Sequence, residues 1–336
     1  MLALVTGATG FVGANLACAL AERGDRVRAL VRRSASRLDA LEGVQVEYAA
    51  GDILDSDSLL EAMRGCQVVF HVAAVSQYWR SGAEAVYRVN VEGTRNVLHA
   101  ALRCGVQRLV HTSSVAALGY SPPHAPADET QTFPDHLRWF VYGHSKHLSE
   151  LEVHEAVGRG LPAVIVNPCV VLGPRDVNFV SGSLIRASVR GQLRVVPPGG
   201  SNLVHVADVV AGHIAAAERG RVGERYILGG ENLSHKAAAR MLSQVTGGPP
   251  PLLTLPAWSL PALARLVDAV NRLNRPLAKT GDFRKPPLVT GQQIRLGART
   301  FYVRNDKAVR ELGLPRTPVC QAAADACAWY REHALL

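Results

Sequence analysis

The sequence predicts an α/β fold in which a doubly wound parallel sheet is followed by a smaller, mostly helical C-terminal lobe. Short apolar runs typical of buried strands alternate with segments of helical periodicity over residues 1–230, and this alternation is typical of a parallel sheet. A glycine-rich turn joins the first such run to the first helical segment. At 336 residues the chain is long for one compact core, so we expect a second lobe.

Composition and charge exclude several classes of protein. A hydrophobic content of 48% is typical of a globular protein, and no apolar run is long enough to span a bilayer. The net charge of +9 comes from arginines that are spread along the chain, which favours a basic solvated surface over nucleic-acid binding. The six cysteines form no CxxC pairs, so we expect a reducing cytoplasm and no metal site. Met1 leads directly into the first strand, which predicts no signal peptide.

Gly7, Gly10 and Gly13 lie between a predicted strand, Met1–Val5, and a predicted helix, Phe11–Ala21. In such a turn the first glycine permits the bend, the second lets the backbone approach a pyrophosphate, and the third lets the helix pack on the strand. The helix N-terminus adds free N–H groups and a positive dipole end. The spacing alone is common, but its position between a strand and a helix at the start of the chain predicts a Rossmann-type dinucleotide site.

The second predicted strand, Arg26–Val31, ends at Arg32 and Arg33, where this fold meets the adenosine ribose. An acidic residue there would bind the ribose 2′-OH, whereas arginine accommodates a 2′-phosphate. No acidic residue occurs between the end of this strand and Asp39. The position therefore favours NADP over NAD, with a solvated loop charge as the alternative.

The alternation continues through the middle of the chain. The predicted strands are Val44–Tyr48, Val68–Val72, Arg108–His111 and Ala163–Val166, with helices through Leu59 and Met63 and from about Glu84 to Arg103. The small residues Ala73 and Ala74 follow the predicted strand Val68–Val72 and would let the backbone pass close to a ligand. Thr112-Ser113-Ser114 follow the predicted strand Arg108–His111. The loop Ser121–Pro134 is rich in Pro, Asp and Glu and is long enough to be a lid or a substrate loop.

Tyr142 and Lys146 open a predicted helix at i, i+4 spacing, so that both side chains lie on one face. A tyrosine with a reference pKa near 10 is a weak acid or base at neutral pH. A lysine charge at roughly 4–5 Å would lower that pKa by about two to three units. The pair is a candidate proton-transfer site, whereas an isolated YxxxK would more often be an exposed helix face.

Beyond residue 176 the alternation is looser. The predicted elements are a strand Asn202–Val206, a helix Asp208–Glu218 capped by Asp208, a last strand Arg225–Leu228, a helix from Ser234 to Val245, and helices at Pro256–Leu273, Asn305–Leu312 and Cys320–His333. His205 is interpreted as structural. We expect residues 1–176, with 201–229 returning to them, to form the dinucleotide-binding domain, and residues 177–200 and 230–336 to form the substrate lobe.

The segment Leu252–Lys285 has an apolar stretch of helical periodicity beside a basic flank. The apolar residues are Leu252, Leu255, Trp258, Leu260, Leu263, Leu266, Val267 and Val270, and the basic ones are Arg265, Arg272, Arg275, Lys279, Arg284 and Lys285. The pattern suits a helix on an anionic membrane surface. A helix packed on the sheet domain is favoured, because Arg265 and Asp268 interrupt the apolar face and two prolines shorten it.

Seven motifs together resemble the extended short-chain dehydrogenase/reductase family over residues 1–230. They are Thr6-Gly7-x-x-Gly10-x-x-Gly13, Asp52-Ile53, Ala73-Ala74, Asn90-x-x-Gly93-Thr94-x-Asn96, Thr112-Ser113-Ser114, Tyr142-x-x-x-Lys146 and Asn167-Pro168. Residues 115–119 and 166–174 are similar to the dihydroflavonol 4-reductase and 3β-hydroxysteroid dehydrogenase branch. The stretch Asn202–Leu233 is similar to bacterial hopanoid-associated sugar epimerases. Val141 departs from the family, in which proline often precedes the tyrosine.

The resemblance implies the roles of individual residues. Tyr142 would transfer a proton to or from the substrate oxygen, Lys146 would lower its pKa and bind the nicotinamide ribose, Ser114 would hold the carbonyl, with Ser113 less favoured, and Asn90 would position the lysine through water. The implied cofactor-binding residues are Gly7, Thr9, Gly10, Phe11, Val12, Gly13, Arg32, Asp52, Ile53, Ala73, Ala74, Thr112, Tyr142, Lys146 and Pro168.

Three functions are compatible with these residues. The first is an NADP(H)-dependent oxidoreductase that interconverts a carbonyl and a secondary alcohol on an apolar or aromatic small molecule. The second is a nucleotide-sugar epimerase or dehydratase with tightly bound NAD. The third, a cofactor-binding regulator without turnover, is disfavoured by the intact Ser114, Tyr142 and Lys146. The absence of an acid at Arg32 favours the first. We expect a monomer or homodimer, and membrane contact as the less favoured alternative.

Overall fold

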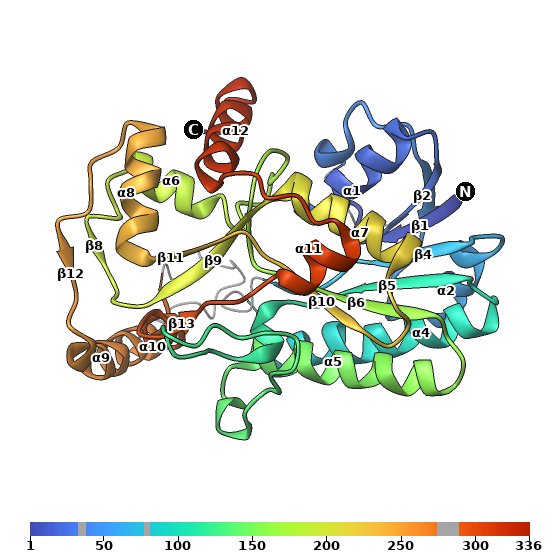
Figure 1. Cartoon of the computed structure of the whole chain (residues 1–336), viewed down its shortest axis with the longest axis horizontal. Helices are drawn as coiled ribbons and strands as arrows, with labels where there is room; N and C mark the ends of the chain where they lie inside the picture. Colours follow the sequence, from blue (N-terminus) through green and yellow to red (C-terminus); the bar gives the residue numbers. More distant parts are fainter. Residues whose placement is uncertain (33–37, 77–80, 274–288) are drawn as a thin grey trace.

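The computed structural model describes residues 1–32, 38–76, 81–273 and 289–336, and its centre is a seven-stranded sheet (Figure 1). The strand order is β10-β6-β5-β4-β1-β2-β3, and every neighbouring pair is parallel. The order reverses between β1 and β4, and such a switch point leaves a crevice at the carboxyl ends of the strands. The predicted fold class is confirmed.

The strands of this sheet are short runs of mainly aliphatic residues. Their bounds are β1 (Leu2–Thr6), β2 (Arg26–Val31), β3 (Glu47–Ala50), β4 (Val68–His71), β5 (Arg108–Thr112), β6 (Ala163–Pro168) and β10 (Arg225–Leu228). The central strands β4 and β6 are buried along their whole length, as expected where helices cover both faces. The edge strand β3 starts three residues later than predicted and pairs with β2 only over Arg28–Val31.

Helices cover both faces of the sheet. On one face α1 (Phe11–Glu22) packs against α7 (Val206–Arg219). On the other face lie α2 (Ser56–Met63), α4 (Gly93–Arg103) and α5 (Val141–Gly158). The helix predicted from Glu84 to Arg103 is confirmed in extent, but a π-helical turn interrupts it. It is composed of α3 (Ala83–Tyr87), η3 (Arg88–Glu92) and α4.

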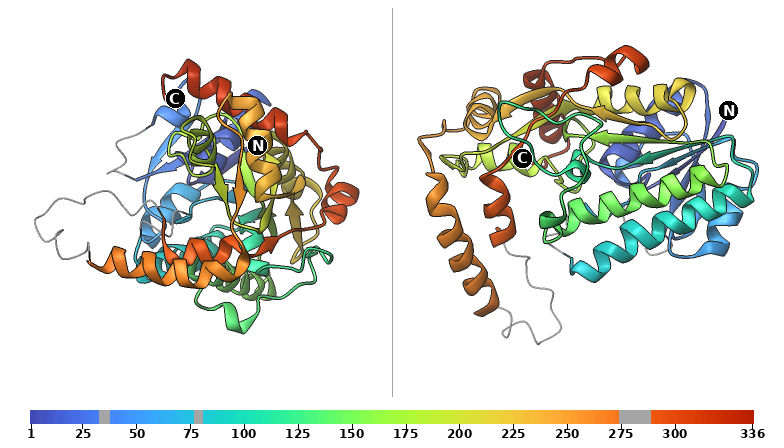
Figure 2. Two further views of the ribbon diagram at one scale, coloured as in Figure 1. Left: turned by 90° about the vertical axis from the view of Figure 1, so that its left-hand side faces the viewer. Right: turned by 60° about the horizontal axis from the view of Figure 1, so that its bottom comes forward.

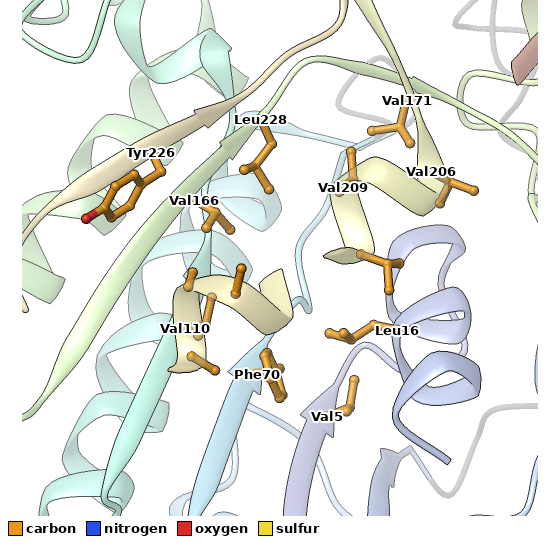
Figure 3. Packing of buried hydrophobic residues seen from close by; sticks show 14 of the residues in the cluster. Val5, Leu16, Phe70, Val110, Val166, Val171, Val206, Val209, Tyr226 and Leu228 are labelled. Carbon is orange, nitrogen blue, oxygen red and sulfur yellow. The ribbon is translucent and has the colours of Figure 1, made fainter. Parts of the chain in front are cut away.

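The core between the sheet and its first helical layer fixes the position of α1. Val5, Phe70 and Val110 project from three neighbouring strands toward Leu16 of α1 and Val209 of α7 (Figure 3). All five side chains are fully buried, and each contributes about 1.5–3 kcal/mol through the removal of apolar surface from water. This packing holds the N-terminus of α1 at the carboxyl end of β1.

A second, four-stranded sheet lies beside the central one. In it β9 (Gly200–His205) pairs with β7 (Val170–Leu172), β11 (Glu231–Ser234) and β13 (Thr300–Phe301). The strand predicted at Asn202–Val206 therefore lies outside the central sheet, while α7 and β10 pack with it. A further pair is β8 (Val195–Val196) with β12 (Leu253–Thr254). The prediction that Arg225–Leu228 is the last strand is wrong, because strands of two to four residues carry too little periodicity to be recognised.

The C-terminal helices surround this second sheet. The helices α6 (Ser183–Val189), α8 (His235–Thr246) and α12 (Val319–Glu332) enclose an apolar cluster that includes Ile185, Leu242 and Tyr330. The helix α11 (Asp306–Leu312) packs on α7 and β10. Single 3-10 turns occur at η1 (Asp39–Leu41), η4 (Val115–Leu118), η5 (Asp135–Leu137) and η6 (Ala257–Ser259).

Helix α7 begins two residues before its predicted start. His205 caps it, because the His205 ring nitrogen Nδ1 accepts a hydrogen bond of 2.9 Å from the Ala207 N–H. Asp208 lies inside the first turn, where its carboxylate accepts bonds from the N–H and hydroxyl of Thr317. The prediction of Asp208 as the cap is therefore wrong, since a distant segment uses its carboxylate. The structural interpretation of His205 agrees with its contacts.

The loop Ser121–Pro134 packs along the C-terminal segment. Ser121 forms a bridge with Thr300, and Ala127 forms one with Val303. Within the described residues, this loop does not line the cleft at the carboxyl ends of the central strands. The expectation of a lid or a substrate loop is therefore not met. Two carbonyl oxygens of the loop accept hydrogen bonds from Arg225, and Asp128 pairs with Arg304.

The predicted amphipathic segment forms α9 (Leu260–Leu273), which packs chiefly on α10 (Gly291–Gly297). Figure 2 shows α9 at the edge of the molecule, away from the central sheet. The packing partner is thus a short C-terminal helix rather than the sheet. The basic residues predicted at Arg275, Lys279, Arg284 and Lys285, like Arg33, lie outside the described residues. No helix among the described residues is long and apolar enough to cross a membrane.

Candidate active site

A cleft of about 1170 Å³ opens at the carboxyl ends of the central strands and extends to the C-terminal helices. Every predicted cofactor-binding residue lies along it. These are Gly7, Thr9, Gly10, Phe11, Val12, Gly13, Arg32, Asp52, Ile53, Ala73, Ala74, Thr112, Tyr142, Lys146 and Pro168. Ser114 also lines the cleft, whereas Asn90 does not. Residues from seven separate stretches of the first 170 are thus brought to one surface.

The glycine turn leaves room at the floor of the cleft. Gly7 has φ of +69°, and a Cβ there would lie 2.7 Å from the backbone of Ala73. A Cβ on Gly13 would lie 2.2 Å from the Gly7 carbonyl oxygen, so helix and turn can pack only with glycine there. Gly10 caps α1 without a side-chain hydrogen bond, and the first residues of the helix, Phe11 to Gly13, line the cleft. This cradle fits a pyrophosphate.

Arg32 and Asp52 flank the part of the cleft beyond the glycine turn. Arg32 follows the last residue of β2 and is exposed. The Asp52 carboxylate accepts the Leu54 N–H at 2.9 Å, which shapes the turn after β3, while Ile53 packs against Gly93. The chain therefore offers a cation and an apolar side chain where an adenosine and its ribose substituents would lie. Both types of group fit a phosphorylated ribose and an adenine ring.

Ser114 and Tyr142 form the centre of the cleft. Ser114 ends the segment after β5 and caps η4, since its Oγ accepts the Ala116 N–H at 3.2 Å. Burial raises the pKa of the Tyr142 phenol, and a hydrogen bond with Ser114 acts in the opposite direction. The phenol is therefore protonated at neutral pH and adjacent to a second hydroxyl.

Lys146 lies one helical turn after Tyr142 and is 3% exposed. Its Nζ donates a 2.7 Å hydrogen bond to the Thr112 carbonyl oxygen, and burial lowers its pKa to about 8. The expectation that Lys146 brings the tyrosine pKa into the neutral range is not met. Burial outweighs every contribution that lowers the Tyr142 pKa, and the lowering contribution comes from Ser114.

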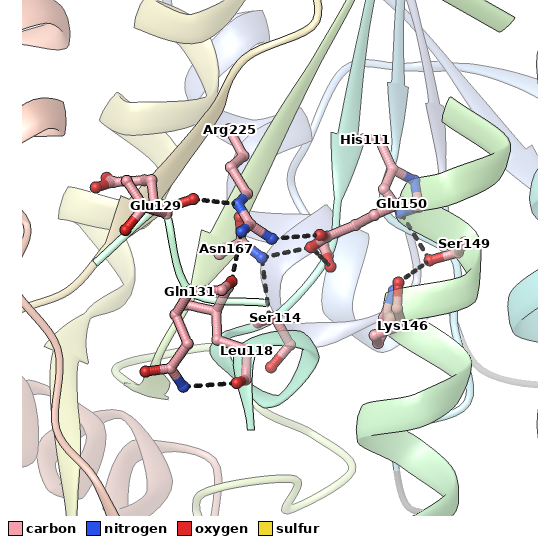
Figure 4. Close-up of polar contacts among 12 residues, drawn as sticks. His111, Ser114, Leu118, Glu129, Gln131, Lys146, Ser149, Glu150, Asn167 and Arg225 are labelled. Atoms are coloured by element: carbon pink, nitrogen blue, oxygen red, sulfur yellow. Dashed lines mark hydrogen bonds and ion pairs between the residues drawn. The ribbon is translucent and has the colours of Figure 1, made fainter. Parts of the chain in front are cut away.

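A buried polar network holds the backbone behind Ser114 (Figure 4). The Asn167 amide donates to the Ser114 carbonyl oxygen at 3.0 Å and to a Glu150 carboxylate oxygen at 2.6 Å. The Ser113 hydroxyl donates to that same oxygen, and Arg225 pairs with the other carboxylate oxygen at 3.0 Å. The side chain of Ser113 is thus engaged with Glu150, which leaves Ser114 as the hydroxyl beside Tyr142.

Sequence reasoning assigned no role to Glu150 or Arg225, and it used Asn167 only as part of a motif. Glu150 lies one turn after Lys146 on the same helix, and this spacing was the available signal. Arg225 lies 75 residues away from Glu150 in the sequence. The fold alone brings the two together.

Asn90 lies behind the cleft, in the π-helical turn. Its Oδ1 accepts a 2.8 Å hydrogen bond from the Val75 N–H, and its Nδ2 donates to the Val75 carbonyl oxygen at 3.2 Å. The same Nδ2 also donates to the Ser145 hydroxyl at 3.0 Å. It therefore holds the segment after β4 against the residue that precedes Lys146. The water-mediated role in positioning Lys146 stays a prediction.

The C-terminal side of the cleft is mainly apolar. Its lining includes Val180, Leu184, Leu193, Val196, Leu203, Leu242, Leu296 and Phe301, with Asn178, Ser181, Ser183, Ser201, Asn202, His235 and Gln293 as polar members. Burial lowers the pKa of His235, so this ring is neutral at pH 7. In the described part of the chain, the arginines and lysines that line the cleft are Arg32, Arg88 and Lys146, all from its N-terminal half.

The described residues contain no cluster of three or more His, Cys, Asp or Glu side chains that could hold a metal ion.

Comparisons with known proteins agree with this arrangement. The profile of the NAD dependent epimerase/dehydratase family matches residues 3–229. A protein of Synechocystis sp. that carries the provisional name dihydroflavonol 4-reductase is 42% identical over 98% of this chain and 94% of its own length. Sterol demethylase protein B of Methylococcus capsulatus is 37% identical over the full length of both chains. A 4-hydroxy-2-methyl-3-oxo-4-farnesyl-3,4-dihydroquinoline-1-oxide ketoreductase of Stigmatella aurantiaca is 33% identical over 97% of this chain and 95% of its own.

Solved structures have the same fold. The crystal structure of gox2253 superposes with a TM-score of 0.86 and 39% identity, covering 100% of this chain and 99% of the other. PA4631, a nucleoside-diphosphate-sugar epimerase from Pseudomonas aeruginosa, superposes with a TM-score of 0.80 and 26% identity over 100% and 99% of the two chains.

Proposed function

The chain belongs to the NAD dependent epimerase/dehydratase family, a group of extended short-chain dehydrogenases/reductases, and from this premise we propose that it is an NADP(H)-dependent carbonyl reductase. Its substrate is an apolar or aromatic small molecule with a ketone that is reduced to a secondary alcohol. The observation that carries this proposal is the lining of the cleft beyond Tyr142. There, apolar side chains predominate, and no described residue of the C-terminal half supplies an arginine or lysine.

The absence of such cations among the described lining residues argues against a sugar nucleotide. A diphosphate is bound by arginine, lysine or a free helix N-terminus. The substrate half instead offers neutral polar groups, such as Asn202 and His235, among leucines and valines. A ketone on an apolar skeleton needs a few directional hydrogen bonds and a large apolar surface, which this half provides.

The chain's own residues perform the proton chemistry. Ser114 holds the substrate carbonyl oxygen through its hydroxyl, and Tyr142 donates its phenolic proton to that oxygen. A nicotinamide bound in the cleft would supply the hydride for the carbonyl carbon, so that one hydride and the Tyr142 proton together convert the ketone to the alcohol. Because burial raises the Tyr142 pKa, the phenol retains its proton until the substrate oxygen becomes basic. Lys146 fixes the Thr112 carbonyl and offers its ammonium group to the cofactor ribose.

The preference for NADP(H) rests on Arg32. Its guanidinium lies at the end of β2, on the wall of the cleft, where the 2′-phosphate of the adenosine ribose would bind. We assign cofactor binding to residues 1–176 together with α7 and β10, and substrate binding to residues 177–200 and 230–336. Asp52 and Ile53, which line the cleft near Arg32, would contact the adenine, and Ala73, Ala74 and Pro168 would lie along the rest of the cofactor.

A second candidate is a nucleotide-sugar epimerase that retains its NAD through each cycle. The similarity to PA4631, which is named as such an epimerase, favours it. The two functions differ in cofactor traffic, because a reductase releases NADP+ after each turnover.

Two measurements on the purified protein test the proposal. Mass spectrometry of the ligand released on denaturation identifies a retained cofactor, and absorbance follows NADPH consumption with a panel of aromatic, steroid and terpenoid ketones. Stoichiometric retained NAD, with turnover of UDP-glucose and of no ketone, would replace the reductase by the epimerase.

A further inference from the structure

Helix α9 presents an apolar face to solvent. Leu260 and Ala264 are buried against the protein, whereas Leu266 is 61% exposed and Val270 is 47% exposed. Trp258, in the turn η6 directly before the helix, is 81% exposed. A helix on the surface of a soluble protein normally turns its apolar face inward and its polar face outward. Helix α9 has apolar residues on both.

The exposed apolar residues form one stripe. Ala262, Leu266, Ala269 and Val270 are all exposed and recur at i, i+4, i+7 and i+8, which places them along a single side of the helix. Arg265 and Arg272 are exposed as well. Arg265 lies three residues after Ala262, and Arg272 lies three residues after Ala269, so both arginines border the stripe on the same edge.

The acidic residue of the helix lies on the opposite side. The Asp268 carboxylate accepts the Gly291 N–H at 3.0 Å and pairs with Arg295 at 3.2 Å, both in α10. Asp268 was the acidic residue expected to interrupt the apolar face. In the structure it is neutralised against α10, so the exposed side of α9 combines apolar residues with positive charge only, within the described part of the helix.

We propose that α9, together with Trp258, binds the surface of anionic membranes. Leucine and valine side chains would enter the boundary between headgroups and acyl chains, tryptophan prefers this boundary, and arginines at the edge of the stripe meet lipid phosphates. The net charge of +9 adds to the attraction for an anionic surface. The helix lies along the surface and does not cross it, as its length and polarity require.

Helix α10 connects this surface to the cleft. Its Gly291 and Arg295 contact α9 through Asp268, while Gln293, Leu296 and Gly297 line the cleft. A substrate dissolved in the bilayer would therefore meet the cleft across one short helix. This last step rests on the proposed function, whereas membrane binding by α9 does not.

Co-sedimentation of the full chain with vesicles tests the proposal without substrate or cofactor. The vesicles contain phosphatidylcholine alone or a mixture with phosphatidylglycerol, each at low and at physiological salt. We expect binding to the mixed vesicles that weakens with salt. The double variant Arg265→Glu, Arg272→Glu should weaken it by about tenfold or more, because each basic residue near an anionic surface contributes about 1 kcal/mol. Leu266→Asp should also weaken it.

Matched controls separate this surface from general charge and stickiness. Arg103→Glu and Val222→Asp change exposed residues elsewhere on the molecule and should weaken vesicle binding much less than the substitutions in α9. Circular dichroism confirms that each variant is folded. Failure of the wild-type chain to bind mixed vesicles at low salt overturns the proposal, as does equal loss in the controls. A dimer that Leu266→Asp dissociates, without vesicle binding, would assign the stripe to a second copy of the chain. Carbonyl reductase activity, measured separately on a water-soluble ketone, is independent of every one of these outcomes.

Discussion

The Arg225 guanidinium lies 3.0 Å from the buried carboxylate of Glu150, and this ion pair stands directly behind the backbone of Ser114. Glu150 is 2% exposed, and its other oxygen accepts hydrogen bonds from Asn167 and Ser113. Arg225 also donates to the carbonyl oxygens of Glu129 and Gln131 (Figure 4). The pair therefore couples the edge strand β10 to the helix that carries Tyr142 and Lys146.

Arg225→Met should destabilise the protein by about 3–5 kcal/mol, because it leaves the Glu150 charge buried without its cation. Chemical denaturation followed by circular dichroism measures the change in unfolding free energy. Arg138→Met is the matched control, since its partner Asp135 is exposed and such surface pairs contribute at most about 1 kcal/mol. Equal effects of the two substitutions would show that Glu150 does not depend on Arg225.

The parts of the site whose residues lie close together in the sequence could be predicted from it. The glycine turn, the Tyr142–Lys146 pair and the residues after β4 and β5 all follow from local patterns, because strand ends and helix starts fix their positions. The network of Glu150, Asn167 and Arg225 could not be predicted that way, since its members come from three different elements and Arg225 lies 75 residues from Glu150.

The electrostatics and the C-terminal lobe were also beyond local patterns. The Tyr142 pKa depends on burial, which no spacing reveals. The orientation of α9 depends on its packing against α10, a helix of only seven residues that starts 18 residues after the end of α9. Asp268 illustrates the point. Helical periodicity predicts that it interrupts the apolar face of the helix, but only the fold shows that its carboxylate faces α10.

Tyr142→Phe should lower kcat for ketone reduction by about two to four orders of magnitude, because it removes only the donated proton. Steady-state assays with NADPH measure kcat, and fluorescence titration should give an almost unchanged affinity for NADPH. Tyr48→Phe, at an exposed position, is the control and should be without effect. Near-normal turnover of Tyr142→Phe would remove this residue from the mechanism.

The two serines after β5 should respond differently to removal of the hydroxyl. Ser114→Ala should lower kcat/KM by about tenfold or more with little loss of stability, because its hydroxyl lies beside Tyr142 in the cleft. Ser113→Ala should lower the unfolding free energy by about 1–3 kcal/mol, since Glu150 loses a buried hydrogen bond. Kinetics and denaturation of both variants decide the assignment, and the reverse pattern would exchange the two roles.

Arg32→Ala should weaken NADPH binding by about tenfold or more and leave NADH binding nearly unchanged, since an arginine–phosphate contact is a charge-assisted hydrogen bond. Fluorescence titration with both cofactors measures the ratio. Arg26→Ala removes an exposed arginine at the start of β2, the strand that Arg32 follows, and serves as the control. An Arg32→Ala variant that loses affinity for both cofactors alike would contradict a contact with the 2′-phosphate.

Acid should destabilise the protein through its buried histidines. Burial lowers the pKa of His213 to about 4 and that of His71 to about 3, below the ordinary value of 6.5. Between pH 6.5 and about 4 the unfolded chain therefore binds protons that the folded chain does not, and the unfolding free energy falls as pH falls. Each such group contributes a slope of up to about 1.4 kcal/mol per pH unit. Urea denaturation at several pH values should show this decline. The His213→Asn variant lacks the titrating group next to Thr112, so its unfolding free energy should fall less steeply as the pH is lowered. An unchanged slope would contradict a neutral His213 in the folded state.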